Sequence, residues 1–225
     1  MRLASKSFSD DEKARVAKAV AEAESKTSAE ILPVVATASG RYDRPEDVVG
    51  LWLGAILAAA AWLAFRGADA AATDWGFSAA GLELPAIIVA LVVGFILGAV
   101  IASRVGWLRA LFTSRTQMRD EVHARARELF FDSRVHHTAG QTGLLVYVSL
   151  FERAAAVIAD KAVTEKLGQG ALDELCAALT ASLASGDVTS ALCSAVGETG
   201  DRLAPVLPRE EGDVNELPDA LVLID

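Results

Sequence analysis

Two long apolar runs constrain this chain more than any other feature. Val48–Phe65 and Pro85–Ser103 contain no Asp, Glu, Lys, Arg or His. At a rise of about 1.5 Å per residue, each forms a helix of about 27–28 Å, close to the hydrocarbon thickness of a bilayer. The rest of the chain is too short to bury two such helices on all sides. The sequence therefore predicts two transmembrane helices, 48–65 and 85–103, joined by a loop over residues 66–84.

The second apolar run carries Gly94 and Gly98 at the GxxxG spacing, which allows close contact between helices. We expect the partner of this pair to be the first run of the same chain; a second copy, in a homo-oligomeric sensor, is the other possibility. Transporters and channels usually need ionisable groups or broken helices at mid-membrane. Both runs lack such groups, which favours an anchor or a helix-packing surface over a transport path.

Basic residues near the two runs predict the topology. Arg41 and Arg44 precede the first run, whereas the loop contains only Arg66. Four arginines follow the second run: Arg104, Arg109, Arg115 and Arg119. Because cytoplasmic flanks are enriched in Lys and Arg, the loop is expected outside and both termini in the cytoplasm. The expected location is the cell membrane, crossed twice.

The charge pattern excludes one class of partner. The formal net charge is −9, and much of it lies in the acidic C-terminal tail, residues 205–225. No basic patch of the kind that binds nucleic acid is present. The bilayer is the first expected partner, and other membrane proteins or a second copy of the chain come next.

The segment before the first run predicts a helix and a strand. Ser9 and Glu12 form an S-x-x-E capping box, which places a helix start at Ser9. Glu30–Thr37 is rich in aliphatic residues and predicts a strand. Pro33 cannot donate a ladder hydrogen bond, so an edge position or a bulge is expected there.

The segment after the second run continues the same kind of pattern. In chain order it predicts an amphipathic helix, two strands forming a hairpin and two further helices: 114–131, 143–151, 154–160, 171–185 and 189–203. The apolar residues Ala220–Ile224 could add another strand. One strand before the membrane cannot bury itself alone.

These elements predict an α/β fold built as a single small α/β sandwich, with the order α-β-[transmembrane hairpin]-α-β-β-α-α. Its first part is residues 1–47 and its second part is 104–204. The transmembrane hairpin, 48–103, is inserted between them, and the tail, 205–225, follows. Both parts must then lie on the same side of the bilayer.

Three segments resemble the TPM-domain family, which occurs in photosystem II repair proteins of plant thylakoids and in bacterial envelope proteins. They are SAEILPVV at Ser28–Val35, the hairpin Thr142–Asp160, and NELPD at Asn215–Asp219. The resemblance covers nearly all residues outside the apolar runs. It implies a compact α/β sandwich attached to a membrane, here in a subgroup with the hairpin inserted in the domain. Some members are linked to acid phosphatase activity or divalent-cation binding, and others look like accessory factors for membrane complexes.

Few residues suggest chemistry. Asp132, His136 and His137 are expected in one loop, where they could hold a divalent cation, although adjacent histidines in an extended segment point in opposite directions. The alternative is a solvated loop without a site. Asp160 at the end of a strand could belong to a site or cap the next helix. A phosphatase would use Asp132, His136 and Asp160 as its catalytic candidates.

Two functions follow from this pattern. The first is a non-enzymatic accessory, assembly or quality-control factor that binds other membrane proteins. The family resemblance favours this function because the segments that carry it specify a fold and contain no catalytic motif. The P-loop, the GxGxxG fingerprint and the GxSxG elbow are all missing from the sequence. The second is a phosphomonoesterase, acid-phosphatase-like and possibly dependent on a divalent cation, as the resemblance implies.

Overall fold

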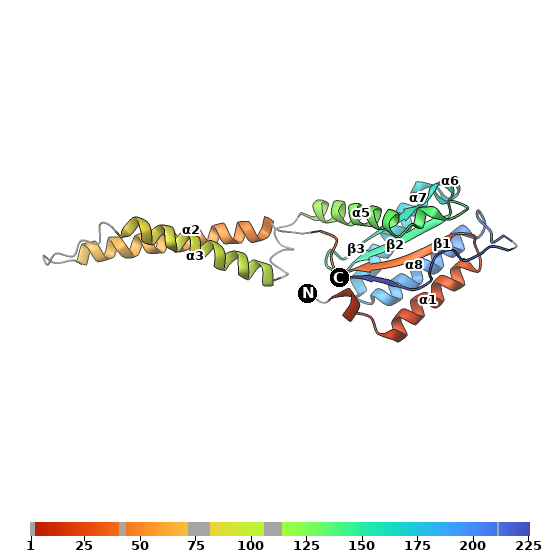
Figure 1. Cartoon of the computed structure of the whole chain (residues 1–225), viewed down its shortest axis with the longest axis horizontal. Helices are drawn as coiled ribbons and strands as arrows, with labels where there is room; N and C mark the ends of the chain where they lie inside the picture. The colour runs from red at the N-terminus through yellow and green to blue at the C-terminus, as the bar shows by residue number, and fades with distance from the viewer. Residues whose placement is uncertain (1–2, 41–43, 72–81, 106–113, 211) are drawn as a thin grey trace. The chain divides into compact units, whose positions relative to one another are not determined.

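The chain forms two compact units in a computed structural model (Figure 1). One unit combines Met1–Gly40 with Thr116–Asp225, and the other is Arg41–Arg115. The mixed helix-and-sheet class expected from the sequence is confirmed. The structure describes residues 3–40, 44–71, 82–105, 114–210 and 212–225. Arg41 and Arg109 of the charge argument, and residues 72–81 of the expected loop, lie outside these ranges.

A four-stranded mixed sheet forms the centre of the first unit, in the order β3-β2-β1-β4. The strands are β1 (Glu30–Ala36), β2 (Gly143–Ser149), β3 (Ala154–Ala159) and β4 (Val222–Ile224). β1 pairs in parallel with β2 and with β4, and β2 pairs antiparallel with β3. The expected hairpin of β2 and β3 is therefore present. The last apolar segment also docks as a strand.

Helices cover both faces of this sheet (Figure 1). The helices α1, α6, α7 and α8 share one core with the sheet, and α5 shares the other. Their bounds are α1 Asp10–Glu24, α5 Arg115–Asp132, α6 Lys161–Leu167, α7 Gln169–Ser182 and α8 Val188–Leu203. Because successive strand side chains alternate, Ile31 and Val35 join the core on the α1 face, whereas Leu32 and Val34 pack with α5. All residues of β1 and β2 are buried, which is typical of strands rich in aliphatic residues.

The capping box predicted at Ser9 is confirmed. The Glu12 backbone N–H donates to the Ser9 hydroxyl at 3.3 Å, and the Ser9 backbone N–H donates to the Glu12 carboxylate at 2.8 Å. These hydrogen bonds satisfy two backbone N–H groups that have no acceptor within the first turn of the helix. Val16 and Val20, one turn apart on α1, are fully buried, so this helix packs its apolar face against the sheet.

Pro33 lies at a locally unpaired edge position, as expected, although β1 as a whole is internal in the sheet. The physical reason is local. β4 pairs only with Val34–Ala36, so at Pro33 the strand has a single strand neighbour, β2. A missing N–H is tolerated at a position where one side of the strand is unpaired.

The start of the C-terminal tail is bonded to the segment that precedes β1. The Ser28 backbone N–H donates to the Leu207 carbonyl at 3.1 Å, and Thr27 forms a bridge with Pro208. The sequence reasoning also missed α6, which follows β3 directly, and the short 3₁₀ helix Val135–His137 in the expected loop. Tertiary contacts determine these short elements, so no strong periodicity marks them.

The second unit is a pair of long helices, α2 (Arg44–Ala71) and α3 (Glu83–Arg104). Within them, Glu46–Arg66 and Glu83–Arg104 are long and apolar enough to cross a membrane, and most of their residues are exposed. α2 continues past Phe65, where the sequence reasoning ended it. Many of the exposed side chains are large and apolar, among them Leu51, Trp52, Ile56, Leu63, Ile88, Val89 and Ile96.

Glycines bring α2 and α3 into contact. A Cβ added to Gly94 would lie 2.7 Å from the Gly54 Cα, and one added to Gly98 would lie 2.7 Å from the Gly50 Cα. Such distances leave room only for hydrogen, so the two backbones touch along this line. The expectation that Gly94 and Gly98 pack against the first run is confirmed. These two glycines are buried within one chain, which removes them as the contact surface of a homo-oligomer.

Candidate functional site

Asp132, His136 and His137 lie close together in the chain but do not converge on one point. Asp132 ends α5 and is exposed, and both histidines lie in the 3₁₀ helix Val135–His137. Their rings are stacked edge to face with centroids 4.4 Å apart, and His136 also packs on the Phe131 ring at 5.0 Å. The cluster is therefore an aromatic stack at the end of α5.

A preformed cation site is missing from this cluster. In the ranges that the structure describes, no group of three His, Cys, Asp or Glu side chains could hold a metal ion. The buried Nδ1 of His136 has no hydrogen-bond partner among the described residues. The use of Asp132, His136 and His137 as cation ligands stays a prediction, and their geometry offers no three-ligand centre for it.

Asp160 caps a helix. Its Oδ1 accepts the Lys161 N–H at 2.7 Å at the start of α6, and its own N–H donates to the Gly143 carbonyl at 2.8 Å. Asp160 thus connects the end of β3 to the start of α6. This is the helix-capping role that the sequence offered as the alternative to a site residue. A catalytic use of Asp160 stays a prediction. Its buried Oδ2 has no partner among the described residues.

Replacing Asp160 by alanine should lower the free energy of unfolding by about 1 kcal/mol, because the α6 N-cap is lost. Chemical denaturation of the full chain measures this change. The matched control is Asp132→Ala, an exposed carboxylate at a helix end, which should change stability by less than about 0.5 kcal/mol. Equal effects of the two substitutions would argue against a capping role for Asp160.

Two of the segments that carry the family resemblance meet at one end of the sheet. The Glu30 Oε2 accepts the backbone N–H groups of Glu216 and Leu217, at 3.2 and 3.0 Å. Glu30 belongs to SAEILPVV, and Glu216 and Leu217 belong to NELPD, which lies far along the chain. A buried carboxylate with two backbone donors fixes the C-terminal segment onto the start of β1.

Glu24 lies beside this contact, in a small acidic cavity of about 120 Å³. Its Oε1 accepts the Ile31 N–H at 2.8 Å, and the residue is only 7% exposed. Burial, helped by the charges of Glu30 and Asp219, raises the pKa of the Glu24 carboxyl to about 8, against the opposing effects of the Ile31 N–H bond and Arg209. Burial also raises the pKa of Glu30. The cavity is lined by Ala21, Glu24, Thr27, Glu30, Arg209, Asp213, Asn215 and Asp219.

This arrangement places a protonated carboxyl beside charged groups at neutral pH. A carboxyl with such a pKa can donate a proton, and strongly shifted values concentrate at functional sites. A larger cavity of about 510 Å³ shares Glu30, Arg209 and Asp213 and adds Lys166 as a second cation. We call the two cavities together the acidic pocket. The sequence reasoning missed Glu24 and Glu30 as site residues; the available signal was a carboxylate at the first position of an apolar strand.

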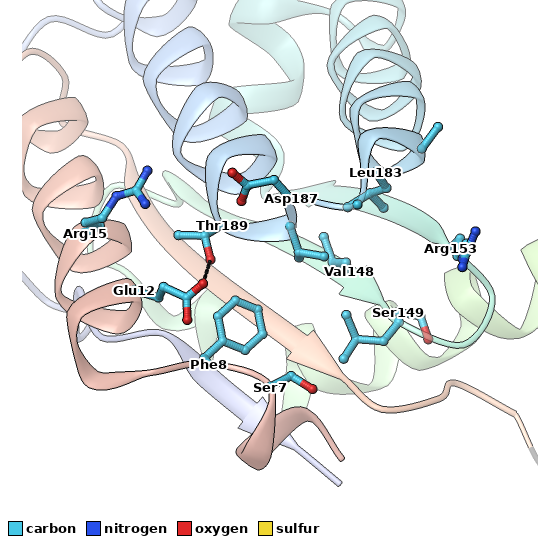
Figure 2. A pocket seen from close by; sticks show the side chains of 14 residues that line it. Ser7, Phe8, Glu12, Arg15, Val148, Ser149, Arg153, Leu183, Asp187 and Thr189 are labelled. Atoms are coloured by element: carbon cyan, nitrogen blue, oxygen red, sulfur yellow. Dashed lines mark hydrogen bonds between the residues drawn. The ribbon is translucent and has the colours of Figure 1, made fainter. Parts of the chain in front are cut away.

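A third cavity, of about 790 Å³, lies at the opposite end of β2 (Figure 2). It is lined by the first turns of α1 and the residues before them, the end of β2, the β2–β3 turn, and the segment from Leu183 into the start of α8. Ligands often bind near the carboxyl ends of parallel strands, where loops and helix starts gather. Figure 2 shows Arg15 and Arg153 on opposite sides of this cavity, with Phe8 and Val148 between them. We call it the carboxyl-edge pocket.

Comparison with known proteins supports the fold alone. No family model matches the chain, and no curated protein matches it. The chain is similar to the NMR structure of the BA42 protein from the psychrophilic bacterium Bizionia argentinensis. The two chains are 15% identical, with a TM-score of 0.55, over 96% of this chain and 94% of that one.

Proposed function

We propose that this protein is a membrane-anchored α/β protein of the TPM-domain type that acts as an accessory or quality-control factor for other membrane proteins. The observation that carries the proposal is the helix pair α2 and α3. Glycines hold its inner side together, and uncharged apolar side chains cover its exposed side. Such a surface is suited to lipid and to lateral contact with other transmembrane helices.

The first unit supports placing both termini on one side of the bilayer. The chain leaves β1 through Ser39 and Gly40, and a Cβ on Gly40 would lie 2.9 Å from the Glu121 Cγ near the start of α5. Both connections to the helix pair therefore begin at the same edge of the sheet. Since β1 and β2 are hydrogen-bonded neighbours, a bilayer cannot separate them. With the arginine distribution, this favours a cytoplasmic unit.

Affinity capture of the full chain in mild detergent tests the accessory role. We expect the chain to recover a reproducible set of other membrane proteins. A control chain keeps the first unit but carries an unrelated apolar hairpin in place of Arg44–Arg104, and it should lose partners that contact the helix pair. Recovery of this chain alone, together with no phenotype on deletion, would reject the accessory role.

A phosphomonoesterase is the second candidate, and the acidic pocket favours it. The raised pKa of Glu24 provides a proton donor for a leaving group, and Arg209 and Lys166 provide cations for a phosphate. The full chain should then hydrolyse a generic phosphate ester, with or without an added divalent cation, and Glu24→Gln should remove the activity. Activity that survives Asp132→Ala with Asp160→Ala would reject the residues expected from the sequence. Absence of any activity rejects the class.

A further inference from the structure

The carboxyl-edge pocket lies beside the segment that leads to the membrane helices. The backbone N–H groups of Ser39 and Gly40 donate to the Glu152 Oε1 at 2.9 and 3.4 Å. Glu152 lies in the β2–β3 turn, and the next residue, Arg153, lines the pocket. The chain then runs from Gly40 to Arg44, where α2 begins. The β2–β3 turn, which carries Arg153, is therefore bonded to Ser39 and Gly40, the last described residues before α2.

The two carboxylates of this pocket are occupied within the fold. Glu12 accepts the Ser9 backbone N–H and, through Oε1, the Thr189 hydroxyl at 3.2 Å. Asp187 accepts the Ser190 backbone N–H at 2.9 Å and its hydroxyl at 2.6 Å. These hydrogen bonds lower the pKa of both carboxyls, so both are ionised. Their charge stabilises the starts of α1 and α8, and Asp187 is also attracted by the Arg15 guanidinium, with no ion pair between them within 4.0 Å.

The two guanidinium groups of the pocket are left for an external anion. Among the described residues, neither Arg15 nor Arg153 has a carboxylate within 4.0 Å. Arg15 reaches only the Ser190 hydroxyl, at 3.4 Å. Arg153 adopts a φ of 49°, a left-handed conformation that disfavours side chains other than Gly, Asn and Asp.

We propose that the carboxyl-edge pocket binds the headgroup of an anionic phospholipid, drawn from the leaflet next to the first unit, with a guanidinium donor on each side, Arg15 and Arg153. Guanidinium groups bind phosphate oxygens with paired, charge-assisted hydrogen bonds. A volume of about 790 Å³ is sufficient for a headgroup and its glycerol, and Phe8, Val148 and Leu183 supply apolar walls. The lipid assignment rests on the proposed membrane anchoring, because Gly40, bonded to the turn that carries Arg153, is only four residues before Arg44, where α2 begins.

Native mass spectrometry of the full chain, released from detergent with added phosphatidylglycerol or phosphatidylcholine, tests the proposal. We expect retained phosphatidylglycerol to exceed retained phosphatidylcholine. Arg153→Gly combined with Arg15→Gln should reduce that retention about tenfold, as expected for the loss of charge-assisted contacts to phosphate. Glycine suits the left-handed position, so loss of binding in this variant does not reflect a damaged turn.

Arg134 offers a matched control. It is also an exposed arginine at positive φ, 56°, but it precedes the 3₁₀ helix Val135–His137 and does not line the pocket. Arg134→Gly should leave lipid retention unchanged. Equal loss in both variants, or equal retention of the two lipids, would overturn the proposal.

Competition with water-soluble glycerol phosphate separates a lipid from a free phosphate. We expect little displacement of the lipid, and complete displacement at comparable concentration would assign the pocket to a soluble phosphate compound instead. Extraction of membranes with alkaline carbonate reports the anchoring separately. A chain that stays in the membrane but retains no phosphatidylglycerol contradicts the lipid site alone, whereas a chain that is extracted contradicts the anchoring.

Discussion

Replacing Gly94 by leucine is expected to force α2 and α3 apart. A Cβ at this position would lie 2.7 Å from the Gly54 Cα and 2.9 Å from the Leu53 carbonyl oxygen. Both are backbone atoms, so no side-chain rotation can relieve the overlap, and the helices must separate or shift. We expect a loss of about 1–3 kcal/mol in the stability of the helix pair, the usual range for overpacking.

Spin labels on the two helices measure this separation. Cysteines placed at Ile56 and Val89, both exposed, carry the labels after the native cysteines have been replaced. The distance distribution should become longer and broader in Gly94→Leu. The matched control is Val93→Leu, one residue away and 45% exposed, which should leave the distribution unchanged. An unchanged distribution in Gly94→Leu would mean that the glycines do not set the helix contact.

Stability should decrease as the pH rises from about 4.5 to about 8, and Glu24 should account for much of the decrease. The pKa of Glu24 is about 8 in the fold, against 4.5 for an ordinary glutamate. The folded state therefore holds a proton that the unfolded state releases between these values. The Glu24 contribution is complete below the lower value and is lost as pH rises through the upper one, with a slope of up to about 1.4 kcal/mol per pH unit.

Glu24→Gln keeps the acceptor for the Ile31 N–H but cannot ionise. The variant should show a flatter pH profile and should exceed the parent in unfolding free energy at pH 8, by an amount on the order of 2 kcal/mol. Chemical denaturation followed by circular dichroism across the pH range measures both. Glu22→Gln, an exposed change two residues earlier on α1, is the control and should follow the parent profile. A parallel profile for Glu24→Gln would contradict the protonated state.

The elements that follow strong local patterns could be predicted from the sequence. The two apolar runs predicted α2 and α3 within a few residues, because their hydropathy is uniform over many turns. The aliphatic runs at 30–37 and 143–151 predicted two strands, and the structure has strands at Glu30–Ala36 and Gly143–Ser149, with every residue buried. The pair Gly94 and Gly98 indicated a helix contact, and the partner glycines on α2 complete it.

The acidic pocket could not be found in the same way. Its central contact joins Glu30 to Glu216 and Leu217, and no local pattern records a pairing across that length of chain. Glu24 looks like one more charge near the end of a polar helix until the fold buries it. In contrast, residue type alone suggested a cation site at Asp132, His136 and His137. In the fold, the two histidine rings pack on each other and on Phe131, and the described residues form no three-ligand site.

Labelling of single cysteines in sealed membrane vesicles tests the central proposal most directly. A membrane-impermeant maleimide is offered from either side to Ser5→Cys, Asp213→Cys and Ser78→Cys, with Cys176 and Cys193 replaced by serine. If the helix pair anchors one α/β unit, Ser5→Cys and Asp213→Cys will react from the cytoplasmic side and Ser78→Cys from the opposite side. Reaction of Ser5→Cys and Asp213→Cys from opposite sides, or of all three from one side, would contradict a two-span anchor inserted in a single unit.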